Sequence, residues 1–329
     1  MHSGPRLSIG LPVFNGENYL GEALESLLRQ TFCDFELVVC DNASTDRTPQ
    51  IVAAAVARDP RVRYVRNDTN IGASPNFAKV ASLTSAPLFK WAAHDDLYEP
   101  TYLEDCIRML DAQPDVVLAH SNCTFIDGEG HTFQAASAPD VFVHAETGLE
   151  IAVDPVALAE ARSPLGRFAD VIFNSRLGTH MFGVIRRSAL DRTASIQNIP
   201  SSDRPFLAEM ALLGPFRQVR ARLFHKRFHG GMTWALSGEE VKAYVSGTTA
   251  RYSPNSRKVR IYLRAPLGKP VSLATKAACC GVVLAYSAKV ACRNLVGRSP
   301  HGRKSTPRKP PADLKRRPGS SPDSRVQVL

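Results

Sequence analysis

The sequence predicts an α/β protein: a doubly wound, mostly parallel sheet with helices on both faces, then a smaller mixed region and a basic C-terminal tail. Two observations predict this fold. Nearly continuous apolar runs, such as residues 35–40, are typical of strands that a parallel sheet buries on both faces. These runs alternate with segments whose apolar residues recur at helical spacing, which indicates repeated βαβ units.

Each element of the first 120 residues follows from a local pattern. Apolar runs bounded by turn residues predict strands, and apolar residues three and four positions apart predict helices. Pro12 is expected to end the first strand, because proline cannot donate to a sheet ladder. The expected strands cover residues 7–11, 35–40, 62–66, 87–93 and 116–120, and the expected helices cover 19–30, 50–58, 77–85 and 101–112.

The second half is less regular. A hairpin turn is expected at residues 127–130, followed by an irregular, proline-containing stretch to about residue 175. Residues 205–213 present one apolar helical face. The uncharged run 277–288 is shorter than the roughly 20 residues that cross a bilayer, so we expect a helix lying on another domain or on a membrane surface.

The net charge of +10 comes from the end of the chain. Residues 293–329 hold ten basic and two acidic residues, a net +8, which leaves +2 for the rest. Without a groove-fitting motif, specific nucleic-acid binding is not expected, and the tail is better suited to anionic lipid. The start lacks a signal-like apolar run and the seven cysteines form no Cys-x-x-Cys pair, so a cytoplasmic protein is expected.

Polar residues follow several predicted strands at the point where each strand ends. Ligands of open α/β sheets bind at the carboxyl ends of the strands. Neither a Gly-x-Gly-x-x-Gly fingerprint nor a P-loop is present, so a nucleotide would be held differently. Asp41 and Asn42 can hydrogen-bond a base or ribose, although turn formation explains Asn42 equally well. The groups expected at this edge are Pro12-Val13, Asp41-Asn42, Asn70-Ile71-Gly72 and Asp95-Asp96.

Asp95 and Asp96 stand side by side where a buried strand ends. Adjacent carboxylates repel, and partial burial is costly unless a cation or hydrogen-bond donors compensate them. One interpretation is a loop before a helix, with Pro100 near its first turn. The other is a Mg²⁺ or Mn²⁺ site that keeps positions open for phosphate oxygens and stabilises a diphosphate leaving group.

Three segments carry a family resemblance: SIGLPVFNGENYLGEALESLLRQTFCDFELVVCDNASTDRT, NIG and HDDLYEP. They resemble the nucleotide-binding half of family 2 glycosyltransferases with the GT-A fold, over residues 7–125 and more loosely over 178–234. The resemblance implies two parts, a nucleotide-sugar-binding α/β half at 1–126 and an acceptor-binding and catalytic-base region at 127–235. Composition predicts two more, a C-terminal helical segment with peripheral membrane association at 236–297 and a disordered basic tail at 298–329.

The resemblance also implies roles for single residues. Asp95 and Asp96 match the acidic motif that binds Mg²⁺ or Mn²⁺, with Asp96 as the leading ligand. Asp203 matches the general base, with Glu209 in reserve, although Asp203 also suits a plain helix N-cap. The residues expected to bind the nucleotide-sugar donor are Pro12, Val13, Asn15, Asp41, Asn42, Asn70, Gly72, Asp95 and His229.

The activity that the resemblance implies is metal-dependent, inverting hexosyl transfer from a nucleoside-diphosphate sugar to a glycan or lipid-linked acceptor. Its setting would be cell-surface polysaccharide synthesis at the inner face of the membrane. The alternative is a catalytically inactive sugar-nucleotide- or glycan-binding protein, because His94 and Asn42 depart from the usual motif residues. His225, Arg227 and His229 lie in a Gly-flanked loop that often closes over the diphosphate in the family, although solvated charges at a strand edge explain Lys226 and Arg227 equally well.

Overall fold

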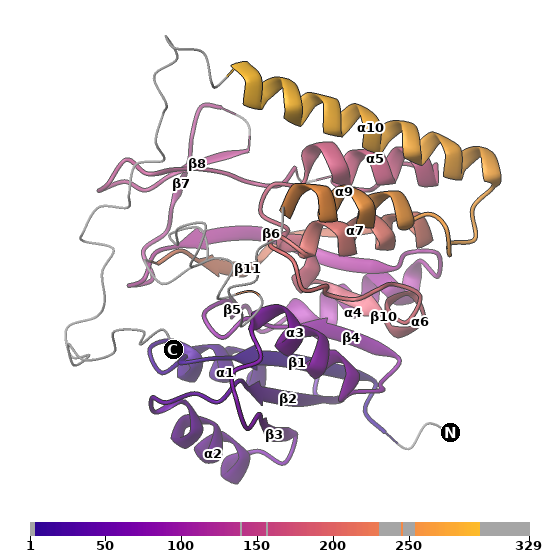
Figure 1. Ribbon diagram of the computed structural model, residues 1–329. Helices are drawn as coiled ribbons and strands as arrows, with labels where there is room; N and C mark the ends of the chain where they lie inside the picture. The colour runs from indigo at the N-terminus through magenta and orange to yellow at the C-terminus, as the bar shows by residue number, and fades with distance from the viewer. Residues whose placement is uncertain (1–3, 139, 156, 230–244, 246–253, 297–329) are drawn as a thin grey trace.

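The computed structural model describes residues 4–138, 140–155, 157–229, 245 and 254–296. The strands of its main sheet are β1 (Leu7–Val13), β2 (Phe35–Asp41), β3 (Val62–Arg66), β4 (Leu88–Trp91), β5 (Leu97–Tyr98), β6 (Leu118–Ile126), β10 (Val184–Arg186) and β11 (Phe216–Arg227). Their order is β3-β2-β1-β4-β10-β6-β11-β5 (Figure 1). β10 and β5 are antiparallel to their neighbours and the other pairs are parallel, so the predicted mostly parallel sheet is confirmed.

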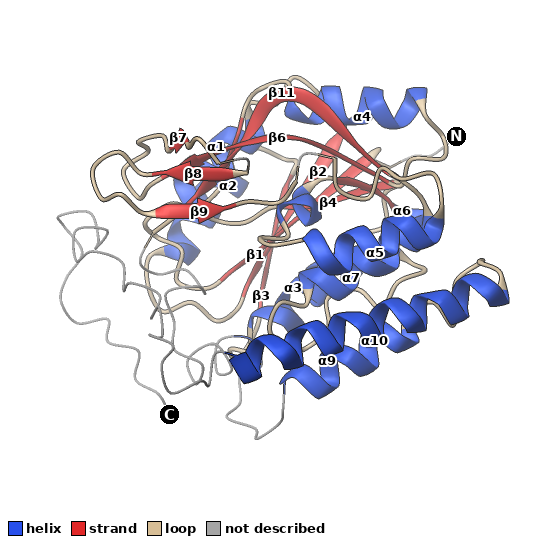
Figure 2. Cartoon of the chain, turned by 90° about the horizontal axis from the view of Figure 1, so that it is seen from above, coloured by secondary structure: helices blue, strands red, loops and turns tan. Residues whose placement is uncertain are grey.

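Helices cover both faces of this sheet. They are α1 (Leu20–Leu28), α2 (Thr48–Arg58), α3 (Ala73–Ser82), α4 (Tyr102–Ala112), α5 (Pro164–Asn174), α6 (Arg187–Leu190), α7 (Asp203–Leu213), α9 (Pro254–Arg264) and α10 (Leu273–Val296), with the 3-10 turn η1 (Thr179–Phe182). Figure 2 shows α1, α2 and α4 on one face and α3, α5 and α7 on the other. In α1 the buried residues recur at helical spacing, as expected for a helix that packs one face on a sheet.

β1 continues through Pro12, so the expected stop is wrong. Backbone polar groups two positions apart on a strand point to the same side, and the Gly10 carbonyl accepts from Ala92 on the β4 side. The β1–β4 ladder ends at Gly10, so the N–H that Pro12 lacks would face no strand. On the other side Pro12 lies in register with Cys40 of β2.

The stretch expected to be irregular contains a helix and a second sheet. Ser163 accepts a hydrogen bond from the Gly166 N–H, and Pro164 occupies the first turn of α5, so this proline begins a helix. The turn expected at residues 127–130 is present, with Gly130 at φ 96°. The strands of the small sheet are β7 (Gln134–Ala135), β8 (Val141–Val143) and β9 (Glu150–Ala152).

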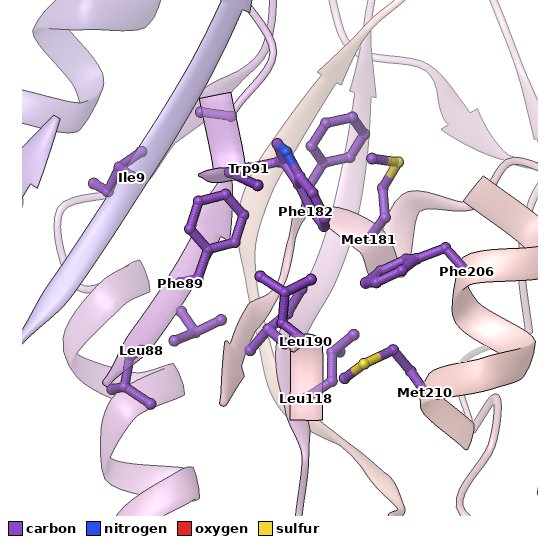
Figure 3. Packing of buried hydrophobic residues seen from close by; sticks show 14 of the residues in the cluster. Ile9, Leu88, Phe89, Trp91, Leu118, Met181, Phe182, Leu190, Phe206 and Met210 are labelled. Carbon is purple, nitrogen blue, oxygen red and sulfur yellow. The ribbon is translucent and has the colours of Figure 1, made fainter. Parts of the chain in front are cut away.

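α7 joins the sheet to the second half of the molecule. Trp91, at the end of β4, meets Phe206 of α7 edge to face with ring centroids 5.1 Å apart. Figure 3 shows both rings in one buried cluster with Phe182 and Met210. α7 leads directly into β11, which is parallel to β6, so α7 runs back against the parallel strands. Its first residue, Asp203, therefore lies toward the carboxyl ends of these strands.

α10 lies along α5 and α9 at the periphery (Figures 1 and 2). Cys279 and Val283 are buried against the domain, whereas Leu273 and Leu284 are 82% and 62% exposed. In the described part of the chain, residues 273–292 form the one helix that by length and composition could cross a membrane. The expectation that this region is too short is wrong, because it counted only the residues between the two lysines of the helix.

Candidate active site

The carboxyl ends of the first four strands carry one set of interlocked loops. Val13 lies in register with Asp41, and its carbonyl accepts a hydrogen bond of 2.8 Å from the Asn42 N–H. His94, after β4, packs against Gly16, where an added Cβ would lie 2.9 Å from the imidazole ring. The loops after β1, β2 and β4 are thus in direct contact.

Asn42 holds the loop after β3 in place. Its amide nitrogen donates to Asn70 Oδ1 at 2.7 Å and to the Gly72 carbonyl at 3.3 Å. Its amide oxygen accepts from Asn67 at 2.9 Å and from the Ile71 N–H at 3.0 Å. Because the Asn42 side chain is buried and its donors and acceptor are engaged, Asn42 organises this loop. Among the asparagines of this hydrogen-bond network, Asn70 is the exposed one.

Asp41 is likewise a buried anchor. Its carboxylate accepts from the Ser44 N–H at 2.8 Å, the Tyr64 hydroxyl at 2.6 Å and the Arg66 guanidinium at 3.1 Å. Burial and the neighbouring Asp41 raise the pKa of Tyr64, which stays a neutral donor. Ser44 in turn accepts from the N–H of the exposed Asn15. Asp41 therefore fixes the loops that present Asn15.

Asp96 is fully buried and has two partners on β11. Lys226 Nζ lies 3.1 and 3.3 Å from its two oxygens, and the Arg227 N–H donates to one of them at 3.0 Å. Burial alone would lower the pKa of Lys226, but the Asp96 and Asp95 carboxylates outweigh it and raise that pKa, so the lysine stays charged. The pair ties the segment between β4 and β5 to the end of β11.

Arg227 is buried too and reaches three segments around the edge. Its guanidinium donates to Glu22 of α1 at 2.8 Å, to the Asp95 carbonyl at 3.0 Å, and to the carbonyls of Asp127 and Gly128. The described part of the chain thus shows Lys226 and Arg227 as internal ties, and the alternative of solvated strand-edge charges is wrong.

Asp95, the other aspartate of the adjacent pair, contacts His229. Their side chains lie 3.0 Å apart, and both are slightly exposed. Burial raises the pKa of Asp95, but His94, His229 and Lys226 outweigh it, so this pKa lies well below its usual range. A carboxylate oxygen suits Mg²⁺ or Mn²⁺, and an imidazole nitrogen, as a softer ligand, favours a transition-metal ion such as Mn²⁺ over Mg²⁺. The described residues show no cluster of three or more such ligands, so a cation here would keep most of its positions for phosphate oxygens or water.

The two candidate bases differ sharply. Asp203 is the first residue of α7, with Ser202 as the N-cap, and it is partly exposed. Burial raises its pKa against the opposing charges of Arg204 and Lys258, which favours proton uptake. Glu209 is buried 2.7 Å from Lys269, in a structural ion pair away from the start of α7.

Sequence reasoning missed the partners that hold these carboxylates. From the sequence alone, Lys226 is expected only as a solvated charge, and Tyr64 and Arg66 only as strand residues. The alternation of Tyr64 and Arg66 on β3, beside a strand ending in Asp41, is a signal that could have suggested their contact. No local signal links Asp96 to Lys226, because 130 residues separate them.

Comparison with solved structures identifies the fold class. The chain superposes on Staphylococcus aureus TarS in complex with UDP with a TM-score of 0.57 and 16% identity, over 85% of this chain and 70% of that one. The fold is the GT-A fold of glycosyltransferases.

Comparison with sequences assigns a family to the first part of the chain. Residues 8–144 match the family described as "Glycosyl transferase family 2", so this segment is a family 2 glycosyltransferase domain. An uncharacterized glycosyltransferase of Haemophilus influenzae is 32% identical over 129 residues, 39% of this chain and 50% of that protein. Escherichia coli chondroitin synthase is 31% identical over 128 residues, 39% of this chain and 18% of that protein. The chain therefore spans half or less of these relatives.

Proposed function

We propose that this chain is an inverting glycosyltransferase that moves a hexose from a nucleoside-diphosphate sugar to a hydroxyl group of a glycan or lipid-linked acceptor. The observation that carries the proposal is a pair of carboxylates of opposite character near one sheet edge. Asp95 has a lowered pKa beside His229, and Asp203 has a raised pKa at the start of α7. Environments that push the pKa values of two carboxylates apart in this way are typical of active sites in which one carboxylate stays ionised and the other takes up a proton.

The donor nucleotide would lie over the loops after β1, β2 and β3. Asn15 and Asn70 are exposed polar residues of these loops, and the buried Asp41 and Asn42 hold the loops in place. Their amide groups can both donate to and accept from a base or a ribose. UDP is the first nucleotide to test, because TarS, which shares the fold, was solved with UDP and with UDP-GlcNAc.

Asp95 and His229 are the residues we propose as holders of a Mg²⁺ or Mn²⁺ ion. Such an ion, when bound, neutralises the diphosphate and stabilises it as a leaving group. Asp96 takes second place to Asp95 in this proposal, because Lys226 and the Arg227 N–H already engage its carboxylate. Its proposed part is to hold β11, and with it His229, beside Asp95.

Asp203 is the proposed general base. It would accept the proton of the acceptor hydroxyl while that oxygen bonds to the anomeric carbon from the side opposite the nucleotide. The bond from the anomeric carbon to the diphosphate oxygen breaks, and its electron pair leaves with the nucleoside diphosphate. Configuration at the anomeric carbon is inverted in this single displacement.

A panel of UDP-, GDP- and dTDP-sugars tests the proposal. Nucleotide release is measured with the full chain, with and without Mn²⁺, and donor binding is measured by calorimetry on the same samples. Release of one nucleotide that requires Mn²⁺ supports the enzyme and names its donor class. Donor binding without release, in the presence of mixed glycan acceptors, would favour the binding-protein alternative.

We also propose that α10 rests on an anionic membrane surface. Residues 254–296 contain eight basic and no acidic residues, and the outer face of α10 exposes alanine, glycine and leucine along its length. One side of α10 is already packed on α5 and α9, which favours lying on the surface over crossing it. If α10 instead paired with α10 of a second copy, two strongly positive segments 254–296 would come together, whereas anionic lipid neutralises their charge.

A further inference from the structure

Asp154 is a buried carboxylate outside the site described above, and it organises a tight turn. It follows β9 and accepts hydrogen bonds from the N–H groups of Arg176, Leu177 and Thr179, and from the Thr179 hydroxyl. Burial raises its pKa, but His180 and the backbone donors outweigh it, so this pKa lies well below its usual range. One ionised side chain therefore fixes residues 176–179.

The turn brings Gly178 against Asp203. Gly178 has φ 65° and ψ 23°, in the left-handed region. A Cβ added to Gly178 would lie 1.9 Å from Asp203 Oδ2, 2.8 Å from its Cγ and 3.1 Å from its Cβ. The missing side chain of Gly178 is therefore the space that the Asp203 carboxylate occupies.

Asp203 itself is placed by packing. Among the described residues, no side chain donates a hydrogen bond to its carboxylate, which leaves the oxygens available for a proton. The next residue, Arg204, donates to the Arg176 carbonyl, so the start of α7 is attached to the same turn. The turn that Asp154 fixes thus contacts α7 at two consecutive residues.

We propose that Asp154 is a positioning residue that acts through Gly178 to set the place of the Asp203 carboxylate. This inference rests on the proposed role of Asp203 as general base. A misplacement of about 1 Å costs an enzyme on the order of 100-fold in rate, so the fit between Gly178 and Asp203 is sufficient to control the reaction.

Gly178→Ala is the direct test, and Gly148→Ala is its matched control. Gly148 also has φ 65°, but a Cβ there would meet nothing within 4 Å, so the control shares the positive φ without the contact. We expect Gly178→Ala to lower nucleotide release by about 100-fold relative to Gly148→Ala, to shift the acid limb of the pH profile, and to leave donor affinity unchanged. Equal release and equal pH profiles in the two variants would overturn the inference.

Two further measurements separate this inference from the proposed function. If Asp203→Asn releases nucleotide as fast as wild type, the base assignment fails. If Asp203→Asn is inactive and Gly178→Ala behaves like its control, the positioning role alone fails. Crystal structures of Gly178→Ala and Asp154→Asn test the positioning role independently of enzyme activity. In both structures we expect the Asp203 carboxylate to be displaced by at least about 1 Å. An unmoved carboxylate in both structures contradicts the proposal.

Discussion

At the scale of single residues, the two adjacent aspartates have different surroundings and should respond differently to mutation. Asp96→Asn leaves the buried Lys226 without its counter-charge, and breaking a buried pair this way costs about 3–5 kcal/mol. Asp95→Asn removes a partly accessible carboxylate and should chiefly abolish Mn²⁺-dependent donor binding. Chemical denaturation and calorimetry on both variants check this.

The double variant Asp96→Asn/Lys226→Met controls for the charge left behind. It should recover part of the stability lost in Asp96→Asn, because no buried ammonium remains unpaired. An Asp96→Asn protein as stable as wild type that has lost Mn²⁺ affinity would show instead that Asp96 is the metal ligand.

The raised pKa of Asp203 predicts the pH dependence of catalysis. Below that pKa the carboxyl is protonated and cannot take the acceptor proton, so the rate falls as the pH falls through it. The acid limb should lie above the ordinary aspartate value of about 3.9, since burial raises this pKa. Rates of nucleotide release between about pH 4 and pH 9 measure the limb. A profile that is flat down to the lower end would rule out Asp203 as the titrating base.

Sequence patterns pointed to Asp95 and Asp203 but not to the groups that tune them. Each lies beside a local signal, the end of an apolar strand or the start of an amphipathic helix. Lys226, Asp154 and Gly178 act through contacts between distant segments, which a single sequence does not encode in any local pattern. The proposed roles of the site residues stay predictions until they are measured.

At the scale of elements, strong periodicity gave the right type of structure and irregular composition did not. β3 covers the residues expected, and the helices at α2 and α4 lie within two residues of their expected limits. α5 was missed because its surroundings are rich in proline, although Ser163-Pro164 is a good helix start. Gly230 and Gly231, which are expected in a loop, and the basic tail at 298–329 lie outside the described residues.

The outer face of α10 offers a prediction about membrane binding. Leu284→Glu places a negative charge on a side chain that is 62% exposed, so stability should change by no more than about 0.5 kcal/mol. Co-sedimentation with anionic vesicles should weaken several-fold, because the charge opposes both the apolar contact and the lipid charge. Val56→Glu on α2, where the side chain is 40% exposed, is the matched control. Equal loss of binding in both variants, or none in either, contradicts a docking role for α10.

At the scale of the whole molecule, one sheet joins the donor side to the base side. β10 lies between β4 and β6, so strands from both predicted halves alternate within the sheet. The contact of Trp91 with Phe206 holds α7 against this sheet. The expected division into two parts at residue 126 stays a prediction. Strands from before and after this residue belong to the same sheet. The arrangement supports a reaction that needs two carboxylates from distant segments near one edge.

The most direct measurement compares binding and cleavage of one nucleotide sugar by wild type and by Asp203→Asn, both with Mn²⁺. Both proteins should bind the donor with similar affinity, while Asp203→Asn should release nucleotide at least about 100-fold more slowly. Equal cleavage by the two proteins would rule out Asp203 as the general base, and a wild type that binds donors but cleaves none of them would rule out the proposed transferase.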